Sequence, residues 1–437
     1  MTDLSSTAPF SRSSHRSEAF EARLQRRYRS ERMFQRAGIG AIIFAGLMLV
    51  MLLTTIVLNG YTAFWQSRFD VSVYFDPEAI SPSGSIDPET LSAGDYPALV
   101  RSALTELVPA ATGRDGKRAL MELVSSAAGY TLRAMVMADP KLIGTHQTVS
   151  LLASDNTDQF IKGHIARSAL PGERTVSDRQ IGWIDDLRAK GVLKSHFSLD
   201  VLTQPNSRQP EQAGMWGALI GSIMTMLVTL ALAVPVGVAA AVYLEEFAPQ
   251  NRWTDLIEVN INNLAAVPSI VFGLLGLSMF LNFFGLPRSS ALIGGVVLAL
   301  MTLPTIIIAS RAALKSVPPS IREAALGIGA SPLQVILHHV LPLAAPGILT
   351  GTILGLARAL GETAPLLLIG MVAFVVNVPA ALSDPSTVLP VQIFMWADAP
   401  ERGWTERTSA AIMLLLGFLI LMNALAVLLR KKFERRW

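Results

Sequence analysis

The chain has 437 residues, of which 51% are hydrophobic and 16% are charged, and its formal net charge is +3. Soluble globular proteins carry about a quarter charged residues. The apolar residues here gather in blocks of about twenty or more, so the composition indicates a polytopic membrane protein rather than a soluble one. The chain has no cysteine, which excludes disulfides and thiolate metal sites. Basic residues collect near the ends of the apolar blocks, so nucleic-acid binding is not expected.

The N-terminal part predicts a basic tail followed by a membrane span. Residues 1–37 are polar and basic, and residues 38–60 form an uncharged apolar run of spanning length. Positive charge beside a first span favours the cytoplasmic side, so we expect a cytoplasmic N-terminus. The tail is expected either to lie on anionic lipid as a helix or to be solvated.

Residues 61–212 differ in composition and predict a separate domain. They carry charges of both signs, contain turn-forming stretches and have no apolar run long enough to span a membrane. Apolar periodicity predicts helices over 96–108, 116–136 and 182–198. We expect a mainly α or α/β periplasmic domain inserted between the first and second transmembrane helices. His146 and His164 lack the acidic or cysteine partners of a metal site, so no metal is expected.

Five further apolar blocks predict a transmembrane domain over residues 213–437. The expected spans are approximately 214–244, 262–284, 290–312, 346–374 and 409–430. Six transmembrane helices would return the C-terminus, with its basic ending RKKFERRW, to the cytoplasmic side. The expected fold class is therefore an all-α polytopic membrane protein.

The loop over residues 316–345 predicts two short helices that meet at a cytoplasmic corner. Ser320 and Glu323 have the spacing of a capping box, which predicts a helix beginning at Ile321. Ser331 followed by Pro332 predicts the start of a second helix. Small residues at this corner would let another protein approach the backbone closely.

This loop resembles the EAA loop of ABC-importer permeases. The resemblance implies a type I ABC importer permease fold and docking of the corner on a separate ATPase subunit. The matching positions are Glu323, Ala324, Ala325, Gly329, Leu341 and Pro342. His339 departs from the aliphatic residue usual in the family. An alternative interpretation is an ordinary pair of helices lying on lipid.

ATP hydrolysis is not expected in this chain. No G-x-x-x-x-G-K-[ST] motif occurs in the sequence, and the nearest stretch, GRDGKR at 113–118, lacks the spacing and the final Ser or Thr. We therefore expect no catalytic residue and no cofactor in this chain, with ATP bound by the partner ATPase.

Two charges lie inside the fifth apolar block. Arg358 and Glu362 are four residues apart, and each charge costs roughly 2.5–3.5 kcal/mol near a bilayer centre. Such charges nearly always face a bundle interior or a hydrated cavity. The planar guanidinium suits an oxyanion, Glu362 could orient it, and Thr363 adds a hydroxyl. The sequence thus predicts a substrate pathway at these three residues; a structural salt bridge between helices is the alternative.

The stretches RALGETAPLLLIG at 358–370 and NNLAAVPSIVFGLLG at 262–276 resemble signatures of the PstA family, the A-type permease subunits of phosphate importers. The stretch at 242–260 is also similar. The resemblance covers residues 214–437 and implies transport of inorganic phosphate across the cell inner membrane past Arg358 and Glu362. The implied partners are a PstC-like sister permease, a PstB-like ATPase dimer and a periplasmic PstS-like phosphate-binding protein. Alternatives are another oxyanion (sulfate, molybdate or phosphonate) or a phosphate-sensing role with a two-component regulatory partner.

Overall fold

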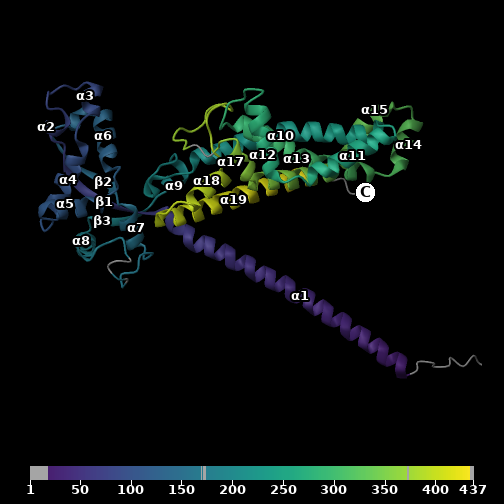
Figure 1. The fold of residues 1–437 in the computed structure, drawn as a ribbon, viewed down its shortest axis with the longest axis horizontal. Coiled ribbons are helices and arrows are strands. Elements are labelled where there is room, and N and C mark those ends of the chain that lie inside the picture. The colour runs from purple at the N-terminus through teal and green to yellow at the C-terminus, as the bar shows by residue number, and fades with distance from the viewer. Residues whose placement is uncertain (1–17, 169, 171–173, 372–373, 434–437) are drawn as a thin grey trace, which may run out of the picture. The chain divides into compact units, whose positions relative to one another are not determined.

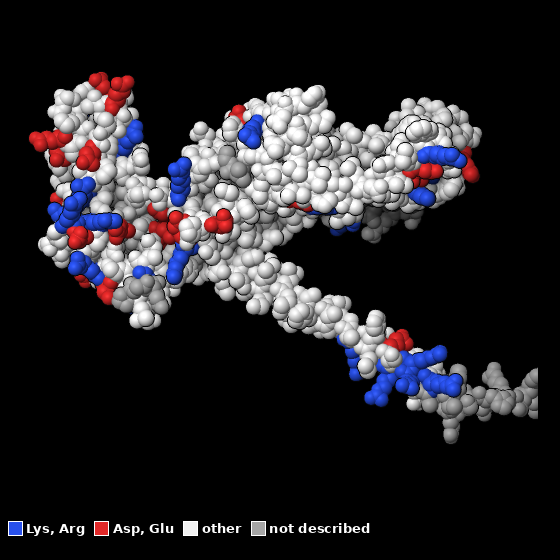
Figure 2. Space-filling model, in the orientation of Figure 1, with Lys and Arg blue, Asp and Glu red and all other residues white. Residues whose placement is uncertain are grey.

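The computed structural model describes residues 18–168, 170, 174–371 and 374–433, so parts of both expected basic termini lie outside the described residues. The chain divides into two compact units, residues 1–56 and residues 57–437 (Figure 1). Helix α1 runs from Glu18 to Gly60; its part up to Ile56 is what is described of the first unit, and its last turn belongs to the second. The basic segment ahead of the expected first span is therefore helical from Glu18 onward. Its arginines, from Arg23 to Arg36, form the blue cluster at one end of α1 in Figure 2.

Residues 61–212 form an α/β domain, called here the insert domain, around a three-stranded antiparallel sheet. Strand β1 (Trp65–Tyr74) lies in the centre, between β2 (His146–Leu152) and β3 (Leu193–Phe197). The helices are short: α2 (Pro77–Ile80), α3 (Pro88–Ser92), α4 (Tyr96–Leu107), α5 (Gly113–Met121), α6 (Ala128–Ala138), α7 (Asp155–Ile161), α8 (Asp178–Ala189) and α9 (Asp200–Thr203), with single turns η1 (Tyr61–Phe64), η2 (Pro140–Leu142) and η3 (Pro210–Gln212).

The core of the insert domain lies on one face of β1. Phe69, Val71 and Val73 alternate along the strand and are almost fully buried, because successive strand residues point to opposite faces. They share one apolar cluster with Leu132 of α6 and Ile184 of α8. Burial of each such side chain contributes about 1.5–3 kcal/mol. The expected helix over 116–136 is divided into α5 and α6, and the end of the one expected over 182–198 is β3.

Four long apolar helices form the bundle of the second unit. They are α10 (Trp216–Val242), α13 (Ala291–Lys315), α16 (Leu341–Gly361) and α19 (Arg402–Phe433). Helix α13 packs against both α10 and α16. Small residues allow the close approach that membrane helices use in place of a hydrophobic driving force. A Cβ on Gly351 of α16, for example, would lie 2.2 Å from the Cβ of Ala309 on α13.

The third expected span is not one helix. The sequence predicts a span over 262–284, but α11 (Arg252–Ala265) and α12 (Ser269–Leu275) are separate helices bent by 103°. The π-helical segment η5 (Gly276–Leu281) continues α12. The break lies at Pro268, which has no N–H to donate and disfavours helical backbone in the residue before it. The span predicted over 262–284 is therefore divided at this proline.

The fifth expected span, 346–374, is also interrupted. Helix α16 ends at Gly361, and Glu362 has extended backbone. A short helix, α17, runs from Ala364 to Leu368, and the next helix is α18 (Leu389–Ala397). Pro365 explains the interruption, because a proline at this position cannot donate the hydrogen bond that would continue α16.

The segment expected to form a corner contains α14 (Pro319–Gly327), α15 (Pro332–Val335) and the π-helical segment η6 (Ile336–Val340). The predicted capping box at Ser320 is wrong: Pro318 occupies the N-cap, so Ser320 already lies inside the helix. The second predicted start is confirmed, since Ser331 caps α15 and forms a capping box with Gln334. Gly329, with φ of +89°, supplies the left-handed turn between the two helices.

Candidate functional site

Arg358 lies in the last turn of α16, where Leu354 and Gly361, about one turn to either side, are also exposed. Gly351, Gly355 and Ala359 of the same helix are buried. The Arg358 side chain is 50% exposed in this chain, and that of Glu362 is 20% exposed. The charged face is therefore left open by this chain and is available to substrate or to a partner subunit.

The Arg358–Glu362 pair lies where the helix is broken. The Nε atom of Arg358 is 3.7 Å from Oε1 of Glu362, a distance that allows charge attraction but not a hydrogen bond. Thr363 follows directly, and its backbone carbonyl accepts bonds from the first turn of α17. Arg358 also lies beside the free carbonyls of the α16 C-terminus, where a cation is favoured. In a membrane, such irregular backbone is tolerated where it is buried in protein or lines a hydrated cavity.

The two stretches that resemble PstA signatures are packed against each other. Helices α12 and α17 are in contact. A Cβ on Gly273 would lie 2.7 Å from the Cα of Pro365, and one on Gly276 would lie 2.9 Å from a methyl of Ile369. Glycine is thus required for this approach, and α12 supports the broken segment that follows Arg358.

The corner formed by α14 and α15 presents small and apolar side chains. Glu323, Ala324 and Gly329 are exposed, whereas Ala325 is buried and holds α14 against the bundle. The exposed apolar side chains of this corner are Leu326, Ile328, Leu333 and Leu337. Leu341 and Pro342 begin α16, so their position ties the corner to the helix that carries Arg358.

Sequence reasoning missed the ion pairs at and beside this corner. Arg322 of α14 donates to both carboxylate oxygens of Glu246, at 2.7 and 3.2 Å. Arg311 of α13 binds Glu245 at 3.3 Å and Glu258 of α11. Glu245 and Glu246 lie in the π-helical segment η4 (Tyr243–Phe247), which ends α10. The adjacent glutamates at the end of an apolar block were the available signal. In Figure 2 these charges form a group at the end of the bundle that carries α14.

A second charged network joins the insert domain to α19. Lys162 binds Glu406 of α19 at 2.6 Å and Asp158 of α7 at 2.7 Å, and all three side chains are at least 89% buried. Arg407 of α19 donates to the backbone carbonyl of Glu211 at 3.1 Å. The insert domain is thus attached to the last helix through buried, charge-assisted bonds.

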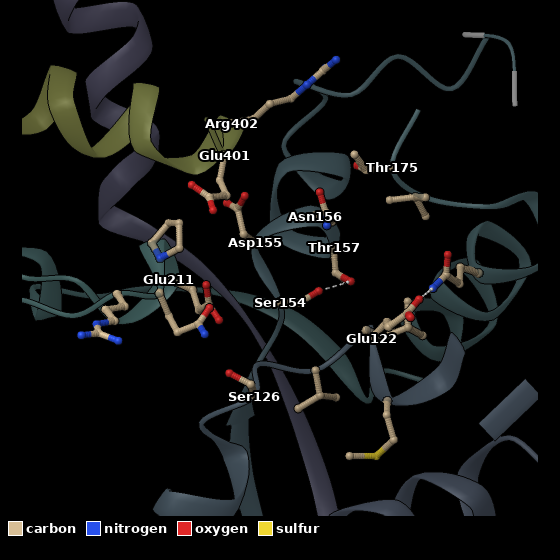
Figure 3. Close-up of a pocket in the computed structure, with 18 of the residues that line it drawn as sticks. Glu122, Ser126, Ser154, Asp155, Asn156, Thr157, Thr175, Glu211, Glu401 and Arg402 are labelled. Atoms are coloured by element: carbon tan, nitrogen blue, oxygen red, sulfur yellow. Dashed lines mark hydrogen bonds between the residues drawn. The ribbon is translucent and has the colours of Figure 1, made fainter. Parts of the chain in front are cut away.

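A cleft of about 860 Å³ opens beside this network (Figure 3). Asp155 and Asn156 approach it from the start of α7, Glu401 and Arg402 from the start of α19, and Glu211 from η3. Burial raises the pKa of Asp155 to about 6. The hydrogen bond from the Gly403 N–H lowers this pKa, and neighbouring carboxylates raise it further. Burial likewise raises the pKa of Glu211, although its hydrogen bond from Ser125 opposes the shift.

In the described part of the chain, no group of three His, Cys, Asp or Glu side chains comes together that could hold a metal ion. His338 and His339 are both exposed in η6.

Comparison with known families finds two matches in the chain. Residues 233–437 match the family described as binding-protein-dependent transport system inner membrane component. Residues 21–170 match a domain of unknown function, DUF3333. The class of protein is therefore a multi-pass inner-membrane permease subunit of an ABC transporter, and it is not itself an enzyme. Such a permease works with an ATPase and a binding protein.

Individual relatives narrow the class. The chain is 32% identical over 227 residues to the phosphate transport system permease protein PstA of Haemophilus influenzae, covering 52% of this chain and 79% of the relative. It is also 32% identical over 229 residues to PstA 1 of Mycobacterium tuberculosis H37Rv, covering 52% and 73%. Among solved structures, a crystal form of the MetNI methionine ABC transporter is 19% identical, with a TM-score of 0.42, covering 51% of this chain and 98% of that one. The chain belongs to the PstA-like family of ABC transporter permeases.

Proposed function

We propose that this chain is the permease subunit of an ATP-driven importer that carries inorganic phosphate across the inner membrane. The observation that carries the proposal is the broken segment at Glu362: a permanent cation beside a helix interruption, on a face that the chain leaves open. Irregular backbone in a membrane is tolerated where it is buried in protein or lines a hydrated cavity, and guanidinium binds phosphate oxygens through paired N–H donors. The named PstA relatives support phosphate over other oxyanions.

In this proposal phosphate passes between the open face of α16 and a PstC-like sister permease. Arg358 attracts the anion, Glu362 holds the guanidinium when no anion is present, and Thr363 offers a hydroxyl. A PstS-like protein delivers phosphate on the periplasmic side. The corner of α14 and α15 docks on a PstB-like ATPase dimer on the cytoplasmic side. Both termini of the chain lie on that side too.

Phosphate uptake by Arg358 variants tests this function. Cells that lack the native permease and carry Arg358→Ala should lose labelled-phosphate uptake, while the assembled complex is still recovered from membranes. Arg358→Lys should be impaired too, because an ammonium cannot form the paired bonds. The matched control is Arg252→Ala, which removes an exposed arginine at the start of α11.

Three outcomes would contradict the proposal. Normal uptake by Arg358→Ala would remove the arginine from the pathway, and loss of the assembled complex would favour a packing role for the ion pair. Dependence of labelled-sulfate or labelled-molybdate uptake on this chain, without any dependence of labelled-phosphate uptake, would assign another oxyanion.

A further inference from the structure

The base of the insert domain carries a group of exposed aromatic and apolar side chains, called here the basal cluster. Trp65 begins β1 and is 46% exposed, Phe197 ends β3 and is 60% exposed, and Leu199 follows at 50%. The rings form one assembly: Phe197 lies edge-on to Trp65 with centroids 5.9 Å apart and stacks on Phe64 at 6.4 Å. Trp65 and Phe197 are paired across the sheet, so the cluster is a built feature of its lower edge.

Hydrogen bonds fix the position of the basal cluster along the axis of α19. Gln66, the residue after Trp65, donates to the carbonyl of Glu211 at 3.1 Å, and Arg407 of α19 donates to the same carbonyl. The next residue, Ser67, donates its N–H to Asp158 at 2.9 Å, within the network that includes Glu406. The start of β1 is therefore level with Glu406 and Arg407 on α19.

The end of α1 lies against the same part of α19. Gly60, the last residue of α1, packs so closely on α19 that a Cβ there would lie 2.9 Å from the backbone of Ser409. Tyr61, which follows Gly60, and Trp216, which begins α10, are both exposed. Tyr and Trp are enriched at the membrane–water interface because their rings are apolar and their N–H or O–H groups are polar.

We propose that Trp65, Phe197 and Leu199 lie in the lipid head-group region and seat the insert domain on the bilayer. We assign lipid to this surface because the basal cluster follows the exposed apolar surface at the C-terminal end of α1. Val57 and Leu58 are exposed there. Only the turn η1 separates that helix from Trp65, and four residues of such a turn rise about 8 Å, close to the thickness of one interfacial layer. Residue 197 and the head groups are thus within reach of each other.

The chain contains no cysteine, so a nitroxide can be attached at one introduced position in the full chain. Phe197→Cys places it in the basal cluster. The matched control is Tyr74→Cys: Tyr74 is 42% exposed and also stands on an aromatic pair, with His146, but at the opposite end of β1. A strand of 10 residues spans about 30 Å, so the control lies well beyond the interface.

The measurement is collision of each nitroxide with oxygen and with a water-soluble nickel chelate, in vesicles of phosphatidylethanolamine and phosphatidylglycerol. We expect nickel collisions at position 197 to be several-fold fewer than at position 74, with oxygen collisions at least as frequent. Equal nickel collisions at both positions would show that the cluster faces water. Protection of position 197 from both reagents would show that protein covers it. Either result would overturn the proposal.

A second measurement does not depend on the folding of the cysteine variants. Tryptophan fluorescence of the unmodified chain, in vesicles with lipid brominated near the head group, should be quenched more than that of Trp65→Phe, since this conservative variant removes only the proposed interfacial reporter. Identical fractional quenching in the two chains would also overturn the proposal.

Discussion

At the scale of single residues, the charges of this chain divide into those visible in the sequence and those whose role depends on distant partners. Arg358 and Glu362 stand out because an apolar block surrounds them. The charges at the base of the insert domain do not, because they lie in polar surroundings and their partners are remote. Gln159 and Glu406, for instance, are 247 positions apart and bond at 2.6 Å. No spacing rule could have paired them.

Asp155 should make the stability of the domain attachment depend on pH. Its pKa is raised to about 6 in the folded chain against 3.8 for the free side chain, so the folded state holds the proton that the unfolded state releases. The stabilisation is present below about pH 4 and is lost as the pH rises to about 6. Asp155→Asn, which stays neutral, should therefore raise the melting temperature at pH 7 more than at pH 5.

The control for this titration is Asp115→Asn, which changes an exposed carboxylate at the start of α5. Its melting temperature should follow that of the wild type at both pH values. An Asp155→Asn chain whose melting temperature depends on pH as that of the wild type does would show that this carboxyl does not titrate between pH 5 and pH 7.

At the scale of elements, glycines decide how closely the bundle helices approach. Gly351 of α16 faces Ala309 of α13 with no room for a Cβ, whereas a Cβ on Gly355, one turn later, would meet its nearest neighbour at an ordinary 3.6 Å. The sequence shows both glycines in the same apolar block and cannot distinguish them, because the difference arises from the neighbouring helix.

Alanine at these two positions should have opposite effects. Gly351→Ala should destabilise the chain by about 1–3 kcal/mol through overpacking. Gly355→Ala should be neutral or stabilising by up to about 1 kcal/mol, because alanine favours a helix over glycine. Thermal unfolding of the two variants in the same detergent would measure this, and equal melting temperatures would contradict the close packing of α13 and α16.

The corner of α14 and α15 gives a prediction for an element that contacts a partner. Glu323 is exposed, and a bulky residue there would obstruct the approach of another protein to Ala324. Glu323→Trp should reduce recovery of the ATPase subunit with membranes. Lys141→Trp, an exposed substitution in the insert domain, is the control. Full recovery of the ATPase with Glu323→Trp would favour the alternative in which the helix pair lies on lipid.

At the scale of the whole molecule, the insert domain is tied to the last helix of the bundle rather than carried on a free linker. The tie depends on Lys162, whose side chain is 9% exposed and which lies between Asp158 and Glu406. Removal of one partner from a buried pair typically costs about 3–5 kcal/mol, because the remaining charge is left without full compensation. Loss of either acidic partner of Lys162 should therefore lower the free energy of unfolding by roughly that amount.

Glu406→Ala should loosen the attachment locally. We expect faster amide hydrogen exchange in α7, which carries Asp158 and precedes Lys162, with little change in α13. Arg118→Ala is the matched control, because Arg118 pairs with Glu122 at an exposed site and such pairs contribute about 0–1 kcal/mol. Unchanged exchange in α7 of Glu406→Ala would show that the network does not hold the domain.

The amino-acid sequence by itself determined which segments are apolar enough to span a membrane, that the stretch between the first two of them differs in composition, and which charges lie inside an apolar block. These properties depend on composition and on local spacing, and each can be evaluated within a few turns of chain. Ser331 as a helix cap belongs to the same group, since its bonds reach only to Gln334. The tendency of proline to interrupt a helix is also local, but whether a given proline does so depends on its surroundings. Pro304 lies within α13, whereas Pro268 separates α11 from α12.

Only the tertiary structure decided that α12 packs on α17, that Arg322 ties α14 to η4, and that one carbonyl of Glu211 joins β1 to α19. The physical reason is that these contacts join residues far apart in sequence, and a polar group leaves no trace in the sequence of which distant partner satisfies it. The free energy of each contact depends on the burial that the whole fold creates.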